Sequence, residues 1–169
     1  MASSSASIPL KLTKQDMIHV LRTTVAALVS LLVARLFKLP EAYWATVTTL
    51  VVMQSTIGAA FTVSWHRLVG SAIGAAAGAL LATYFGLNAA MFAVGIFVMG
   101  IVCAILRLDR VAYRFAGVTL AIVMLVVHLS PAWIVAVHRF IEVSVGIVVA
   151  LAITAVWPED QPASNLPAS

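Results

Sequence analysis

Apolar residues occur along most of this chain in long runs, without the polar interruptions that mark the surface of a soluble helix or strand. A helix needs roughly 20 apolar residues to cross the hydrocarbon layer of a bilayer. The predicted transmembrane helices cover residues 17–37, 42–61, 67–85, 89–106, 111–129 and 132–157. A membrane β-barrel would instead alternate polar and apolar residues, and these runs do not alternate. The pattern predicts an all-α integral membrane protein with six transmembrane helices.

Turn-forming residues mark some of the predicted helix ends. Residues 86–88 are expected to form the turn between the third and fourth helices. Ser130 is the predicted N-cap of the last helix, with Pro131 as its first helical residue. The predicted divisions are a disordered tail at 1–13, the six-helix domain at 14–158 and a disordered tail at 159–169.

The composition agrees with a membrane protein, since 63% of the residues are hydrophobic and 9% are charged. A soluble domain carries about 25% charged residues. The net charge of +4 arises because acidic residues are few. The basic residues lie singly between apolar runs and form no basic patch, so no nucleic-acid partner is expected. Basic residues assigned to the cytoplasmic side are Lys11, Lys14, Arg22, Arg67, Arg107, Arg110 and Arg114, against Arg35 and Lys38 outside. This bias predicts that both termini are cytoplasmic.

The two halves of the chain resemble each other weakly. Residues 66–74 match residues 138–146, and residues 42–50 match residues 112–120. Chance similarity between apolar helices is the alternative explanation. If the repeat is genuine, each unit has three helices, and the odd number forces the second unit to insert upside down. We therefore expect two degenerate inverted three-helix repeats, an arrangement found in many transporters.

Glu142 is the strongest candidate for chemistry, because the pattern places a carboxyl group near the middle of the hydrocarbon layer. Arg139 lies three residues earlier on the same helix face and can pair with it. The pair is either structural or part of an anion or proton site. Arg67 is expected to begin the third helix, so that Arg67 and Arg139 lie at opposite ends of one anion path. Arg22 either joins the cytoplasmic arginine or extends to the lipid headgroups.

Aromatic and small residues supply further candidates. Tyr43 and Trp44 either belong to the interfacial aromatic belt or stack on an aromatic substrate. The predicted second helix also carries a polar stripe that includes Gln54, and this stripe must face protein or water. Small residues spaced four apart favour close helix packing. The glycines expected at such contacts are Gly70, Gly74, Gly78 and Gly146.

Several classes of site are not predicted. The four histidines lack metal-ligand spacing, and the single cysteine, Cys103, excludes a multi-cysteine metal site. No Ser-His-Asp or Cys-His arrangement indicates an enzyme, and no nucleotide-binding loop indicates ATP hydrolysis. We expect no cofactor and no bound metal.

Motifs spread over residues 14–158 resemble the membrane domain of the fusaric acid resistance and aromatic acid exporter superfamily, to which plant aluminium-activated malate transporters are related. The matching motifs are Arg22-Thr-Thr-Val-Ala-Ala, Pro40-Glu-Ala-Tyr43-Trp44-Ala45, Gln54, Arg67-x-x-Gly70-Ser71-x-x-Gly74-x-x-x-Gly78, Arg139-x-x-Glu142-x-x-x-Gly146 and Pro158. The resemblance implies a six-helix protein of the bacterial inner membrane that moves organic anions, often aromatic carboxylates, outward. It also implies a homodimer or other homo-oligomer.

Three functions follow as hypotheses. The first is a proton-coupled organic-anion exporter in which Arg67 and Arg139 attract the carboxylate, Glu142 exchanges a proton, and Tyr43 with Trp44 contacts an aromatic ring. The second is a passive anion channel with a structural Glu142. The third is a non-transporting membrane subunit, because larger members of the superfamily add a cytoplasmic domain or a second membrane domain that this sequence lacks.

Overall fold

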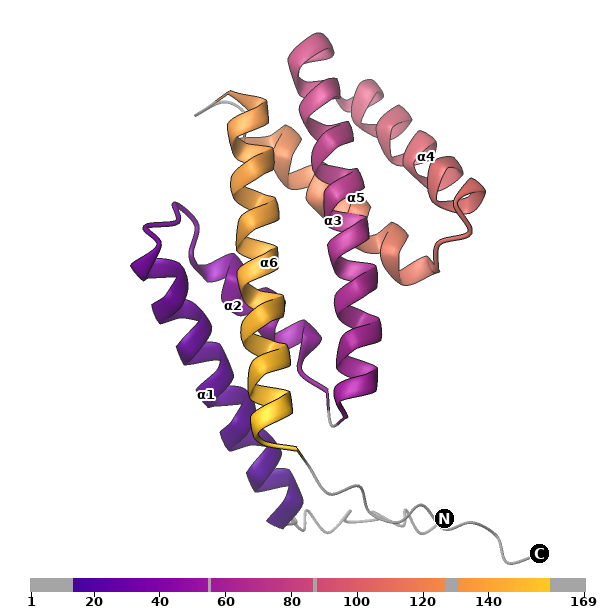
Figure 1. Cartoon of the computed structure of the whole chain (residues 1–169). Helices are drawn as coiled ribbons and strands as arrows, with labels where there is room; N and C mark the ends of the chain where they lie inside the picture. The colour runs from indigo at the N-terminus through magenta and orange to yellow at the C-terminus, as the bar shows by residue number, and fades with distance from the viewer. Residues whose placement is uncertain (1–13, 55, 87, 127–130, 159–169) are drawn as a thin grey trace, which may run out of the picture.

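The computed structural model describes residues 14–54, 56–86, 88–126 and 131–158, and these residues form six α-helices and no strand. Figure 1 shows their arrangement. The helices are α1 (Lys14–Leu36), α2 (Tyr43–Val52), α3 (Ile57–Phe85), α4 (Ala89–Ile105), α5 (Arg110–Val126) and α6 (Ala132–Val156). Three of them, α1, α3 and α6, are long and apolar enough to cross a membrane, whereas α2 and α4 are shorter apolar helices.

The two longest helices, α3 and α6, lie side by side and antiparallel in the centre of the protein (Figure 1). The other helices are divided between them. Both α1 and α2 pack on α6, while α4 and α5 pack on α3. Each half of the chain therefore supplies the central helix on which the other half packs.

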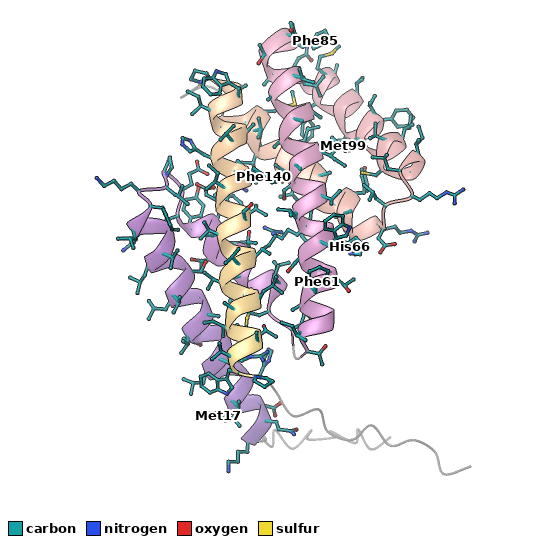
Figure 2. All side chains as sticks on the ribbon, viewed as in Figure 1. Met17, Phe61, His66, Phe85, Met99 and Phe140 are labelled. Carbon is teal, nitrogen blue, oxygen red and sulfur yellow. The ribbon has the colours of Figure 1, made fainter. Side chains whose placement is uncertain are left out.

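The outer surface is apolar. Large side chains such as Leu32, Phe61 and Phe97 are more than half exposed, and Figure 2 shows side chains projecting from the outer sides of the helices. Such a surface is unfavourable in water but matches the hydrocarbon of a bilayer. Together with the three long apolar helices, it describes a multi-pass membrane protein.

The predicted boundary between the second and third helices is wrong. Instead of continuing to residue 61, α2 ends at Val52, and α3 begins at Ile57 instead of at Arg67. The reason is local: Thr56 is extended and its side chain accepts a hydrogen bond from the N–H of Ala59, which caps α3. Arg67 does not mark the start of the helix, because its side chain is buried against neighbouring helices instead of reaching the membrane surface.

The connections after α1 and α4 have the same backbone form. Lys38 and Arg107 have positive φ angles of 54° and 51°. The N–H groups of Leu39 and Leu108, one residue later, donate to carbonyls in the last turn of each helix. This pattern is the Schellman motif that commonly ends a helix.

The predicted turn after α3 is confirmed where the structure describes it. Gly86 ends α3 with a φ of 64°, and Asn88 caps α4 by accepting a hydrogen bond from Ala90. Pro131 is the N-cap of α6 and not its first helical residue. Ser130, Leu87 and both predicted tails lie outside the described residues.

Glycines allow the central helices to approach their partners closely. A Cβ atom on Gly74 would overlap the carbonyl oxygen of Ala116 in α5, and one on Gly146 would overlap the carbonyl oxygen of Ala45 in α2. Gly70 and Gly78 also lie at the contact between α3 and α5. All four glycines singled out in the sequence are buried at helix contacts.

Candidate functional site

Arg139 and Glu142 form a buried ion pair on α6. Arg139 Nη1 lies 3.2 Å from Glu142 Oε2, and the two side chains are 3% and 1% exposed. The sequence left this pairing open, and the structure contains it within one chain. Removing two charges from water is costly, so a buried pair requires further contacts that compensate.

The start of α2 supplies those contacts. The backbone N–H of Glu41 donates to Glu142 Oε1 at 3.1 Å, and the Glu41 carboxylate lies 3.9 Å from Arg139 Nη1. The Arg139 guanidinium also lies 3.9 Å from the centre of the Trp44 ring, which is a cation–π distance. The site is therefore built between the middle of α6 and the first residues of α2.

Three buried polar atoms of this cluster have no hydrogen-bond partner among the described residues. They are Arg139 Nε, Trp44 Nε1 and Glu41 Oε2. Buried polar groups are nearly always hydrogen-bonded to protein or to ordered water. The cluster thus retains two donors and one acceptor that a bound water or ligand would satisfy.

Arg67 lies on α3 in an equivalent environment. Its Nε and Nη2 atoms donate to Thr48 Oγ1 at 3.2 and 3.0 Å, and its guanidinium lies 4.6 Å from the centre of the Phe115 ring. Thr48 is fully buried and Arg67 is 6% exposed. Each central helix thus carries one buried arginine covered by an aromatic ring from the shorter helix that crosses it.

The two arginines do not lie at opposite ends of a path. Arg139 contacts Trp44 and Arg67 contacts Thr48, and these α2 residues are four positions apart, on the same face of one helical turn. The expectation that Arg67 and Arg139 lie at opposite ends of one anion path is therefore wrong. Instead, α2 brings both buried arginines into one region, together with Glu142 and the partly exposed Glu41.

The structure places Arg22 and Gln54 together at another location. Arg22 is fully buried and its guanidinium donates to the carbonyl oxygens of Gln54 and Trp157. These contacts connect α1 to the segment between α2 and α3 and to the end of α6. Gln54 lies in that segment and not in α2.

Tyr43 and Trp44 have different surroundings. Their rings are 5.4 Å apart at an interplanar angle of 37°. Tyr43 is 55% exposed, whereas one face of Trp44 is covered by the Arg139 guanidinium. Of the two rings, Tyr43 is the more accessible to a ligand.

Sequence reasoning did not assign Glu41, Thr48 or Phe115 to the site. Thr48 belonged to the polar stripe noted in the sequence, but its partner could not be identified there. The internal repeat did not identify Phe115, because matching residues 42–50 with 112–120 aligns Trp44 with Arg114, whereas in the structure Phe115 covers Arg67 as Trp44 covers Arg139. No group of three His, Cys, Asp or Glu side chains that could hold a metal occurs in the part of the chain that the structure describes.

Comparison with known proteins identifies the family of this chain. The model of the fusaric acid resistance protein family matches residues 16–167, which is most of the chain. The chain belongs to this family. It is 32% identical over 163 residues to a protein of Escherichia coli K12 described as an uncharacterized transporter, and equally similar to its counterpart in Escherichia coli O157:H7.

The match includes 88% of this chain but 23% of each Escherichia coli protein, so this fusaric acid resistance family member spans about a quarter of the length of those relatives. No solved structure matches it.

Proposed function

We propose that this chain is the membrane domain of a transporter that exports organic anions, chiefly aromatic carboxylates, across the bacterial inner membrane. The observation that carries the proposal is Arg139: a guanidinium inside a membrane helix, 3% exposed, with one buried donor that no described residue satisfies. Buried ionisable residues inside membrane helices commonly mark substrate or ion paths. The family match and the relatives described as transporters support the same function.

The chemistry of the cluster suits a carboxylate. The planar guanidinium of Arg139 presents donors in the geometry that carboxylates accept. Arg67, one turn of α2 away, adds positive charge, and the accessible ring of Tyr43 lies beside Trp44 at the same end of α2. A carboxylate attached to an aromatic ring would thus find both a cation and a stacking surface.

Glu142 is the proposed proton site. In its charged form it holds the Arg139 guanidinium, so a proton on Glu142 would release that guanidinium for a substrate carboxylate. Proton and anion then favour each other's binding and move in the same direction. The pH gradient that accelerates efflux is therefore one that is acidic on the side the anion leaves. Where the outside is the more acidic side, export by this coupling requires an outward gradient of the anion that exceeds the opposing pH gradient.

A passive anion channel is the second candidate, and a specific observation favours it. Glu142 is fully buried and is held both by Arg139 and by the backbone N–H of Glu41, as a permanent structural pair would be. The third candidate is a non-transporting membrane subunit.

The proposed architecture is two inverted repeats in six membrane-crossing segments. Its support is the matching of contacts between halves: Trp44 on Arg139 with Phe115 on Arg67, and Ala45 at Gly146 with Ala116 at Gly74. The basic residues near helix ends favour cytoplasmic termini. We also propose that the active form is a homo-oligomer, as the resemblance of the sequence motifs to the superfamily implies.

Efflux of labelled 4-hydroxybenzoate from proteoliposomes holding the purified protein alone tests the proposal. We expect efflux that accelerates when the vesicle interior is acidic, and that loses this dependence in Glu142→Gln. Efflux indifferent to the pH gradient in both proteins would establish the channel. Absence of efflux for every carboxylate tried, with the protein folded and correctly inserted, would refute independent transport and favour the subunit.

A further inference from the structure

A second carboxylate reaches the arginine that the proposed function assigns to the substrate. Glu41 Oε2 and Glu142 Oε2 approach the same Nη1 atom of Arg139, at 3.9 and 3.2 Å. The shorter contact is a hydrogen-bonded ion pair, and the longer one exceeds hydrogen-bond distance. Arg139 therefore has one firmly held carboxylate partner and one loosely held one.

The two carboxylates differ in how they are attached. Glu142 is 1% exposed, belongs to the same helix as Arg139, and accepts a hydrogen bond through each of its oxygens. Glu41 is 27% exposed, lies in the connection before α2, and leaves its enclosed Oε2 atom without a hydrogen-bond partner among the described residues. Glu41 can move away from the guanidinium because it is already in contact with solvent. Moving Glu142 away would instead leave a fully buried carboxylate without its charged partner.

We propose that the Glu41 side chain is a tethered competitor for the anion site, occupying the position beside Arg139 that a substrate carboxylate takes. The inference rests on the proposed anion site. A glutamate side chain and a carboxylic acid substrate present the same carboxylate group to a guanidinium. When a monocarboxylate replaces Glu41, the charge around Arg139 is unchanged, because one negative charge enters as another leaves.

A competing Glu41 and a structural Glu41 predict opposite changes in anion affinity when the side chain is removed. The apparent affinity for the anion is proportional to the fraction of molecules in which the anion site is free. A side chain that blocks the site for part of the time therefore lowers that affinity. If Glu41 is beside Arg139 for roughly 70–90% of the time, its removal tightens anion binding about threefold to tenfold. A merely structural Glu41 would instead, on removal, loosen the site and weaken binding.

The connection between α4 and α5 offers a matched control. Asp109 is a loop carboxylate that pairs with His66 at 2.9 Å, and no arginine takes part in that pair. Figure 2 labels His66 on α3, on the side where α5 begins. Asp109→Asn therefore removes one loop carboxylate from the equivalent connection without changing the surroundings of Arg139.

The experiment measures benzoate binding by titration calorimetry in detergent for the wild type, Glu41→Gln, Glu41→Ala and Asp109→Asn, together with efflux from proteoliposomes. We expect both Glu41 variants to bind benzoate about threefold to tenfold more tightly and to show a correspondingly lower half-saturating concentration. Asp109→Asn should match the wild type. Unchanged or weaker binding in folded Glu41 variants would overturn the competitor while leaving transport intact. Tighter binding without any wild-type efflux would support the competitor and refute the transport function.

Discussion

Replacing Gly146 with alanine tests the contact on which the site depends. A methyl group at this position would overlap the carbonyl oxygen of Ala45 and approach the Thr48 Cβ atom to 2.7 Å. Neither neighbour can rotate away, because one is backbone and the other is a Cβ atom. The hydroxyl of Thr49 also donates to the carbonyl of Gly146 at 3.0 Å, which holds α2 against α6 at this point.

The expected magnitude follows from two opposing effects. Overpacking a tight contact costs about 1–3 kcal/mol, and more when backbone must move. Alanine recovers about 1 kcal/mol of helix propensity over glycine. The overlap at Gly146 is with backbone, so a cost near the upper end, about 2–3 kcal/mol, less the propensity gain lowers the free energy of unfolding of Gly146→Ala by about 1–2 kcal/mol. We also expect reduced anion efflux, because α2 carries Trp44 and Thr48.

Gly58 provides the matched control. It lies in the first turn of α3, and a Cβ atom there would meet nothing within 4 Å. Gly58→Ala should gain up to about 1 kcal/mol from propensity alone. Thermal unfolding in detergent, followed by tryptophan fluorescence, distinguishes the two variants. The midpoint temperature of unfolding shifts by about 2–4 °C per kcal/mol for a chain of this size. A Gly146→Ala protein as stable as Gly58→Ala would refute the close approach of α2 to α6.

Two other substitutions probe buried polar contacts. Thr48→Val removes the acceptor of two Arg67 donors and should cost about 1–3 kcal/mol of stability in the same unfolding assay. Thr46→Val is its control and should be neutral, because the Thr46 hydroxyl has no hydrogen-bond partner among the described residues. A neutral Thr48→Val would show that Arg67 is held by other groups. Arg22→Met removes hydrogen bonds to the carbonyls of Gln54 and Trp157, each worth about 1.5–3 kcal/mol, and should increase protease cleavage between α2 and α3, unlike Arg35→Met at an exposed position. Equal cleavage of these two variants would contradict the role given to Arg22.

Helix existence was predictable from this sequence because long apolar runs admit few alternatives. All six predicted helices have a counterpart, and the turn at Gly86 and Asn88 was evident from residue type alone. The boundary near Arg67 was not predictable in the same way. A basic residue in an apolar run marks the edge of a membrane span unless tertiary partners bury it. Those partners, Thr48 and Phe115, lie on other helices.

The contacts of the candidate site likewise differ in how far they could be predicted. The pairing of Arg139 with Glu142 depends on spacing within one helix, so it was among the alternatives that the sequence allowed. The approach of Glu41 to Arg139 joins residues at distant positions in the chain, so no local pattern contains it. The separation of Arg67 from Arg139 was misjudged for the same reason, because the crossing of α2 brings the two together.

The exchange of partners between the two halves has a consequence for biosynthesis. During synthesis from the N-terminus, α1 and α2 enter the membrane well before α6, the helix on which both pack. Until then Trp44 lacks the Arg139 guanidinium, and the Arg22 guanidinium lacks the carbonyl of Trp157. An insertion intermediate with three helices therefore holds incompletely paired polar groups in lipid, so the fold closes only when the last helix arrives. A nascent chain interrupted before α6 would be a natural substrate for membrane quality control.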